Sequence, residues 1–408
     1  MKAFWAVFKK DKINWFSLVV LILAFAALVW FNFNRLTYIA DADSTGEMGL
    51  YNLLSEEGGI ISQNWHYSTE LRILNTQLIM APLFALIDNW FTATAVGNIL
   101  LYIILIFSYC FMMRGLGVQL KWTLLTASCL LVGFSYSYFS FVLVLAYYIP
   151  HIILQFFIVG AFVRLLRAED YARKYIVFLG CLYVFLAFMT GLASVRYLLI
   201  VHAPLLLAGF FTMLNKTEDM QSMTLRGFFG QKNTKIFLLG LIGIGVAAVG
   251  VLFNYEVLSE SYTYAKGAQM GISFTEKSVI GTLDYTAGYL LEGLGYTKGA
   301  KLFSSAGIAN LFVFVMVALV GLCTVWLYKR RKKLPRAQAF FCTFALMSFI
   351  VNVFAYSFLL FYGDEYTDLT RFYLPMLVLP FPVIAIYMQQ QTQPLKKAVV
   401  AALLFGLV

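Results

Sequence analysis

Two aspartates separated by one residue, Asp41 and Asp43, stand just after the first long apolar run of the chain. A carboxylate next to hydrocarbon is costly, so an acidic pair where a chain leaves a membrane is a candidate reaction centre. Such carboxylates could take a proton from an attacking hydroxyl, or bind a divalent cation such as Mg²⁺ or Mn²⁺. The alternative is that they are ordinary solvated acids of an outer loop.

Two arginines at the ends of apolar segments offer complementary chemistry. Arg196 lies in Ala-Ser-Val-Arg-Tyr and Arg371 in Thr-Arg-Phe-Tyr-Leu-Pro. A guanidinium group matches the oxygens of a phosphate, so both residues are candidates for binding a lipid phosphate at the membrane surface. The alternative is an ion pair, which for Arg371 would involve Asp364, Glu365 or Asp368.

Four more side chains near these charges are candidate substrate contacts. His151 follows Tyr148 in Tyr-Tyr-Ile-Pro-His and could orient a hydroxyl or, when protonated, bind phosphate. Tyr373 follows Arg371 by two residues, and Glu47 falls in a stretch, 46–54, with helix-like spacing. For His151 the alternative is a histidine whose hydrogen bonds are satisfied at the membrane interface.

The elements that must position these residues are membrane helices. The 408 residues are 61% hydrophobic and 12% charged, a balance typical of an all-α polytopic membrane protein. Segment 74–87, with Pro82 at its centre, is short for a crossing and is expected to be interfacial. About 11 transmembrane helices are predicted, at roughly 15–33, 94–113, 122–139, 150–167, 175–191, 197–214, 235–253, 308–328, 338–361, 372–389 and 398–408.

The distribution of charge predicts the orientation. If 74–87 does not cross, 22 of the 30 basic residues lie on the side of the N-terminus, which is therefore cytoplasmic. This rule explains the formal net charge of +10 without any nucleic-acid partner. We expect a multi-pass protein of a plasma membrane, of bacterial type, with the acidic pair on the extracytoplasmic face.

One transmembrane domain, 1–408, is expected. It divides into an N-terminal module, 1–215, with an outer loop at 34–93, and C-terminal spans, 216–408, with an outer loop at 254–307. The chain stops about eleven apolar residues into the last predicted span, as if within a helix.

The order of these features resembles the GT-C superfamily of lipid-dependent glycosyltransferases, such as protein O-mannosyltransferases and aminoarabinose transferases. The resemblance rests on the basic N-terminus, one span, the exit-loop acids of DADSTGEMGLYNLLSEEGGIIS, and the juxtamembrane segment with Pro82 before the second span. It implies that Asp43 or Asp41 is the catalytic base and that Arg371 holds the donor phosphate. The second outer loop departs from the family pattern, because it offers His151 where the family often has an acid.

The resemblance implies an inverting transferase that moves a sugar from a polyprenyl-phosphate donor to a hydroxyl of a glycan, lipid or protein acceptor. Membrane lipids are its other expected partners, and no fixed metal site is predicted. A lipid or polysaccharide transporter or flippase is the first alternative, although the predicted spans contain few ionisable residues and no repeat. A polysaccharide polymerase or ligase is the second.

Overall fold

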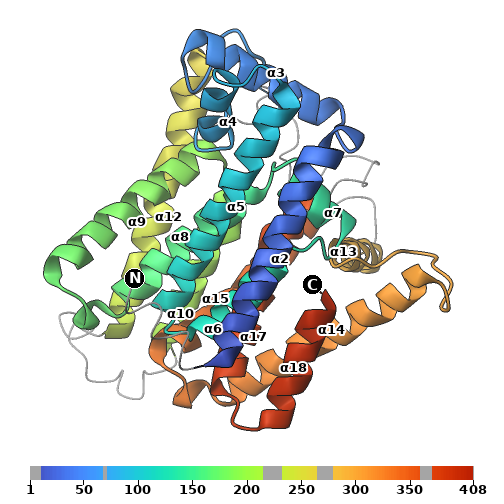
Figure 1. Ribbon diagram of the computed structural model, residues 1–408. Helices are drawn as coiled ribbons and strands as arrows, with labels where there is room; N and C mark the ends of the chain where they lie inside the picture. The colour runs from blue at the N-terminus through green and yellow to red at the C-terminus, as the bar shows by residue number, and fades with distance from the viewer. Residues whose placement is uncertain (1–10, 68–70, 215–231, 264–278, 359–369, 408) are drawn as a thin grey trace.

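The computed structural model describes residues 11–67, 71–214, 232–263, 279–358 and 370–407. Within these residues the regular structure is helical and contains no β-strand. Long helices pack into a bundle, and short helices cover one end of it (Figure 1). The predicted all-α class is therefore confirmed.

Seven helical segments of the described part are long and apolar enough to cross a membrane. At 1.5 Å per residue, the shortest of them, with 21 residues, is about 31 Å long and matches a hydrocarbon core of about 30 Å. The segments are α2 (Lys12–Arg35), α5 (Trp90–Gly115), α9 (Arg173–Ala193), α12 (Lys232–Glu256), α14 (Ser305–Lys329), α15 (Arg336–Phe358), and α16 (Thr370–Leu377) with α17 (Pro380–Gln390).

An interrupted segment would make an eighth crossing. The short α7 (Tyr136–Tyr138) continues into a π-helix, η2 (Phe139–Val144), and α8 (Ile149–Leu165) follows at an angle of 80°. The four residues between η2 and α8 form a sharp turn. The chain is thus compatible with a multi-pass membrane protein.

Three of the eleven predicted crossings form shorter helices, so the predicted number of crossings is not confirmed. They are α6 (Leu120–Leu130), η4 (Leu198–His202) with α10 (Ala203–Leu214), and α18 (Pro394–Leu407). The prediction for 122–139 was wrong about continuity. Helix α6 ends there, and Ser135, whose hydroxyl accepts a hydrogen bond from the Tyr138 amide at 3.0 Å, caps a new helix.

The first predicted outer loop contains two helices, α3 (Ala42–Glu57) and α4 (Gln77–Phe84), as expected for juxtamembrane helices. Helix α4 has eight residues, or about 12 Å, and is too short to cross. The predicted outer loop at 254–307 contains α13 (Val279–Gly293). Single-turn helices complete the structure at η1 (Leu36–Tyr38), η3 (Ala168–Asp170), η6 (Leu258–Glu260) and η7 (Arg331–Lys333).

The two ends of the bundle differ in charge. We call the end covered by α3 and α4 the α3 end (top of Figure 1) and the opposite end the basic end. At the basic end, Asp11 caps α2 and accepts a hydrogen bond from Lys121 at 2.8 Å. The connection from α14 to α15, with five consecutive basic residues, lies at this end too.

Helices α9 and α12 approach each other closely through glycines. A Cβ atom on Gly191 would lie 1.9 Å from the Ala247 carbonyl oxygen, and one on Gly250 would lie 2.3 Å from that of Phe188. Small residues permit such backbone contact between membrane helices. The contact fixes the end of α9, just before Arg196.

Candidate functional site

The acidic pair lies at the start of α3 because Asp41 is the N-cap of that helix. The Asp41 carboxylate accepts a hydrogen bond from the Ser44 amide at 2.8 Å, and the Ser44 hydroxyl accepts one from the Asp41 amide at 2.8 Å. This reciprocal capping satisfies amides that an exposed helix end leaves open. Gly58, at φ 69°, terminates the helix in the left-handed conformation. One oxygen of Asp41 is therefore occupied by the fold.

Asp43 has a different environment, two residues into the helix. Its side chain is exposed and has no hydrogen-bond or ion-pair partner among the described residues. The amides of the first helical turn give this region a partial positive charge, which favours a carboxylate there. Of the two predicted bases, Asp43 is the one whose oxygens are both available to a substrate.

Glu47 lies one turn further along α3 and forms an ion pair with Arg72. Both side chains are partly buried, at 17% and 24% exposure. Burial and the Glu47 charge raise the pKa of Tyr51, whose hydroxyl pairs with that of Thr76 at 2.8 Å. Glu47 was predicted to contact substrate, and its carboxylate is engaged in joining α3 to the segment before α4.

Tyr147, which was not among the predicted site residues, reaches the acids from the turn between η2 and α8. Its hydroxyl donates a hydrogen bond to the Asp41 carboxylate at 3.4 Å. Burial raises the pKa of Tyr147, and the negative charges of Asp41, Glu47 and Asp43 raise it further. The phenol therefore stays neutral beside the Asp41 carboxylate. A tyrosine in a predicted outer turn was the only sequence signal for this role.

The neighbouring residue, Tyr148, contacts the first of the two predicted arginines. The Tyr148 hydroxyl accepts a hydrogen bond from Arg196 at 2.9 Å. The Arg196 guanidinium carbon lies 4.4 Å from the centre of the Phe372 ring, and that of Arg371 lies 5.4 Å from the same centre. The structure thus brings Arg196 and Arg371, 175 positions apart in sequence, to one aromatic ring.

His151 lies between the two groups of charges. Its ring stacks on Tyr197, with centroids 4.9 Å apart, and on Tyr148, with centroids 5.2 Å apart. The side chain is 6% exposed, and neither ring nitrogen has a hydrogen-bond partner among the described residues. Arg196 and Arg72 both act on it electrostatically. Its nitrogens are available to a bound group.

Tyr373 is 1% exposed and packs edge-on against Tyr356, with centroids 5.4 Å apart. Its hydroxyl interacts with Ser357 and Thr286. Tyr373, on α16, therefore packs against α13 and α15. The acids suggested as ion-pair partners of Arg371 fall in 359–369, outside the described residues.

The described residues contain no group of three or more histidine, cysteine, aspartate or glutamate side chains arranged to hold a metal ion. A divalent cation at Asp43 would therefore need ligands from the substrate. The chemistry that this chain itself offers is an available carboxylate, two arginines and a histidine at one end of a helical bundle.

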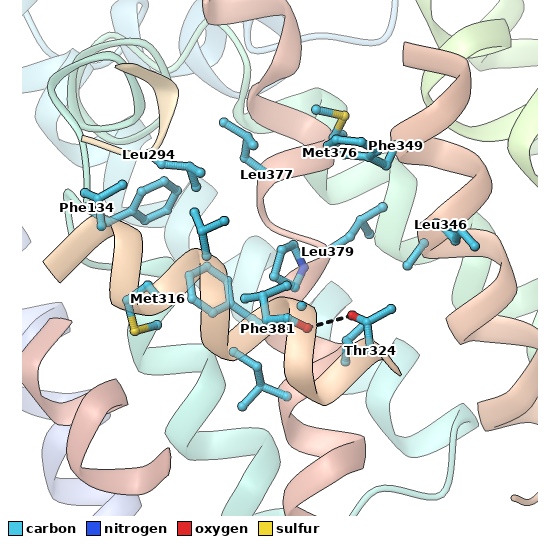
Figure 2. Close-up of a pocket in the computed structure, with 18 of the residues that line it drawn as sticks. Phe134, Leu294, Met316, Thr324, Leu346, Phe349, Met376, Leu377, Leu379 and Phe381 are labelled. Carbon is cyan, nitrogen blue, oxygen red and sulfur yellow. Dashed lines mark hydrogen bonds between the residues drawn. The ribbon is translucent and has the colours of Figure 1, made fainter. Parts of the chain in front are cut away.

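An apolar cavity of about 520 Å³ lies between α14, α15 and the α16–α17 pair, and none of the site residues described above lines it. Figure 2 shows its walls, which include Phe134, Leu294, Met376 and Phe381. Thr324 is the one hydroxyl among its described lining residues, and that hydroxyl donates to the carbonyl of Val320 at 2.8 Å. The cavity therefore offers no free hydrogen-bonding side chain.

The cavity extends along α14. Its walls include Ala309 and Val325 of α14, sixteen residues or about 24 Å apart along the helix. They also include Leu377, six residues or about 9 Å along α16 from Arg371.

No known protein family, no curated protein and no solved structure matches this chain.

Proposed function

We propose that this chain is a membrane glycosyltransferase that moves a sugar from a polyprenyl-phosphate donor to an acceptor hydroxyl at the α3 end. The observation that carries the proposal is the turn between η2 and α8, where Tyr147 bonds Asp41, two residues before Asp43, and Tyr148 bonds Arg196, which shares the Phe372 ring with Arg371. Charge segregation along the chain favours an extracytoplasmic position for this end.

Asp43 is the proposed general base. It takes the proton of the acceptor hydroxyl as that oxygen forms a bond to the anomeric carbon of the donor sugar. The bond between the anomeric carbon and the phosphate oxygen breaks on the opposite face, so the configuration inverts and polyprenyl phosphate leaves. Exposure and the absence of a partner among the described residues support Asp43 over Asp41 for this role.

Arg196 and Arg371 are proposed to bind the leaving phosphate. Charge-assisted hydrogen bonds from arginine to phosphate are about twice as strong as neutral ones, and they strengthen as negative charge develops on the leaving group. The shared Phe372 ring holds the two guanidinium groups at one place. His151, with two buried ring nitrogens, is proposed to bind a hydroxyl of the substrate.

The cavity is proposed to hold part of the donor's hydrocarbon chain. Its described lining is apolar and has no free polar side chain, so a hydrocarbon is the ligand that it can bind without a desolvation cost. It begins about 9 Å along α16 from Arg371, which matches a lipid whose phosphate lies at the surface and whose chain enters the bilayer.

The test compares Arg371→Ala with Arg35→Ala. Arg35 is an exposed arginine at the last position of α2, and among the described contacts it touches none of the site residues. Purified protein would be assayed with synthetic polyprenyl-phosphate sugars, and envelope glycans would be compared by mass spectrometry with and without the chain. We expect Arg371→Ala to raise the donor KM or lower kcat by about 10-fold or more, and Arg35→Ala to leave both unchanged. Equal effects of the two variants would contradict the proposal.

A lipid flippase is the second candidate, favoured by the two interrupted segments, η2–α8 and α16–α17. Discontinuous helices are common in transporters. A flippase would move a fluorescent lipid across reconstituted vesicles, and Asp43→Asn would leave that movement intact. Sugar transfer that depends on Asp43 distinguishes the transferase.

A further inference from the structure

The turn between η2 and α8 has an unusual backbone. Ala146 lies in the left-handed region, at φ 59°, although it is not a glycine, and its side chain is 2% exposed. Such a conformation persists only where the surrounding structure holds it, and it is often found at functional sites. The preceding π-helix is another feature that is frequent at such sites.

A buried polar network bonds the backbone just before this turn. Helix η2 ends at Val144, so its last carbonyls have no further helical turn to bond. The Asn98 side-chain amide donates to the Val144 carbonyl at 2.7 Å, and the Tyr102 hydroxyl donates to the Leu143 carbonyl. Two side chains of α5 thus replace the missing helical bonds of η2.

A third residue, from α2, joins the two α5 side chains. The side-chain oxygen of Asn32 accepts a hydrogen bond from the side-chain amide of Asn98 at 2.8 Å, and the side-chain amide of Asn32 donates one to the Tyr102 hydroxyl at 2.9 Å. Asn32, Asn98 and Tyr102 are 2%, 0% and 0% exposed. Polar groups so deeply buried are costly unless they are paired, so this network has a defined geometry.

We propose that Asn32, Asn98 and Tyr102 are positioning residues that set the spacing between the two halves of the site. The turn that they hold carries Tyr147, which bonds Asp41, and Tyr148, which bonds Arg196. One rigid four-residue connection therefore links the acids to the arginines. The catalytic consequence rests on the proposed transferase function, whereas the structural consequence can be measured without it.

The experiment replaces Tyr147 with a fluorinated tyrosine and records its ¹⁹F resonance in the purified full chain at pH 7. In the parent protein this half-buried phenol donates a hydrogen bond to the Asp41 carboxylate at 3.4 Å. The test variants are Asn98→Leu and Tyr102→Phe, the second removing one hydroxyl only. We expect both to release the turn toward water and to move the resonance from its position in the parent protein toward that of free fluorotyrosine.

Gln338→Leu is the matched control. Gln338 is also a buried amide, 1% exposed, and it donates to the carbonyl of Leu116 at 3.0 Å, but it lies at the basic end. We expect it to leave the resonance at position 147 unchanged. An unchanged resonance in folded Tyr102→Phe protein, or the same shift in Gln338→Leu, would overturn the proposal; if Asn98→Leu does not fold, Tyr102→Phe decides.

Transfer kinetics give the second measurement. A misplacement of about 1 Å can cost about 100-fold in rate, so Tyr102→Phe is expected to lower kcat by about 10- to 100-fold with little change in the donor KM. A loss confined to KM would contradict a positioning role. If the resonance shifts as expected but no form of the protein transfers sugar, the transferase proposal fails and the positioning of the turn stands.

Discussion

The two aspartates at the start of α3 should respond differently to the same substitution. Asp43 has no partner among the described residues, whereas an oxygen of Asp41 caps the helix at 2.8 Å from the Ser44 amide. Loss of a general base lowers the rate by about 10²- to 10⁴-fold, which is about 2.7–5.4 kcal/mol at 1.36 kcal/mol per factor of ten. We therefore expect Asp43→Asn to lower kcat by at least about 100-fold.

The stability of Asp43→Asn should change little. The substitution removes one negative charge from the first helical turn, which is worth about 0.3–1 kcal/mol. Asp41→Ala, in contrast, removes the cap and should lower the free energy of unfolding of α3 by about 1 kcal/mol. Asp41→Asn retains an acceptor oxygen, so the cap and most of the activity should survive.

The assay combines transfer of a radiolabelled sugar from a polyprenyl phosphate with thermal unfolding in detergent. Asp88→Asn is the matched control, because Asp88 is an exposed acid of the same predicted outer loop without a role in the site. Full activity in Asp43→Asn would refute the assignment of the base. A larger loss of rate in Asp41→Asn than in Asp43→Asn would mean that the capping carboxylate is also the reacting one.

Three further predictions concern other parts of the molecule. Arg72→Ala should lower the free energy of unfolding by about 1–3 kcal/mol, between the values for exposed and buried pairs, because it leaves Glu47 partly buried without its cation; Glu47→Gln in the same background should restore part of the loss. The Lys121 hydrogen bond holds the pKa of Asp11 below its usual value, so the stability that this bond contributes is present above the ordinary carboxyl range and is lost as pH falls through the lowered pKa. The free energy of unfolding of Asp11→Asn, measured by thermal unfolding, should therefore differ from that of the parent by up to about 1 kcal/mol at pH 7 and should not differ at low pH. In a cysteine-free background, an impermeant thiol reagent added outside should label Ile60→Cys; no labelling would reverse the proposed orientation.

The sequence was sufficient to predict the helical class and a helix within α3. Apolar length predicts membrane helices directly, and the predicted stretch 46–54 lies inside α3. The start of α3 was not predicted: the Asp41 cap begins the helix at Ala42, four residues earlier, so Asp43 lies in its first turn. The sequence also predicted that 74–87 is too short to cross, and α4 has only eight residues. These features depend on residues close together in the chain.

The number of crossings was harder to predict because apolar content does not reveal breaks. Segment 122–139 contains no charged residue, yet 131–135 separate α6 from α7. Mean hydropathy over a window does not detect such a break, whereas the Ser135 hydroxyl cap marks where the next helix begins. The same limit applies to Val378 and Leu379, where α16 ends and α17 begins in a segment that reads as one span.

The contacts within the site could not be predicted, because each one joins distant segments through a conformation with no sequence signature. Tyr147 bonds Asp41 from a turn in which Ala146 has φ 59°, and Asn98, 48 positions before Ala146, bonds the last carbonyl of the π-helix that precedes this turn. Sequence reasoning selected the charged residues as well as Tyr148 and Tyr373, and passed over the neutral Asn32, Asn98 and Tyr102. In a hydrocarbon environment the neutral amides and hydroxyls are the groups that can be buried at tolerable cost, so they are the groups that determine where the charged residues lie.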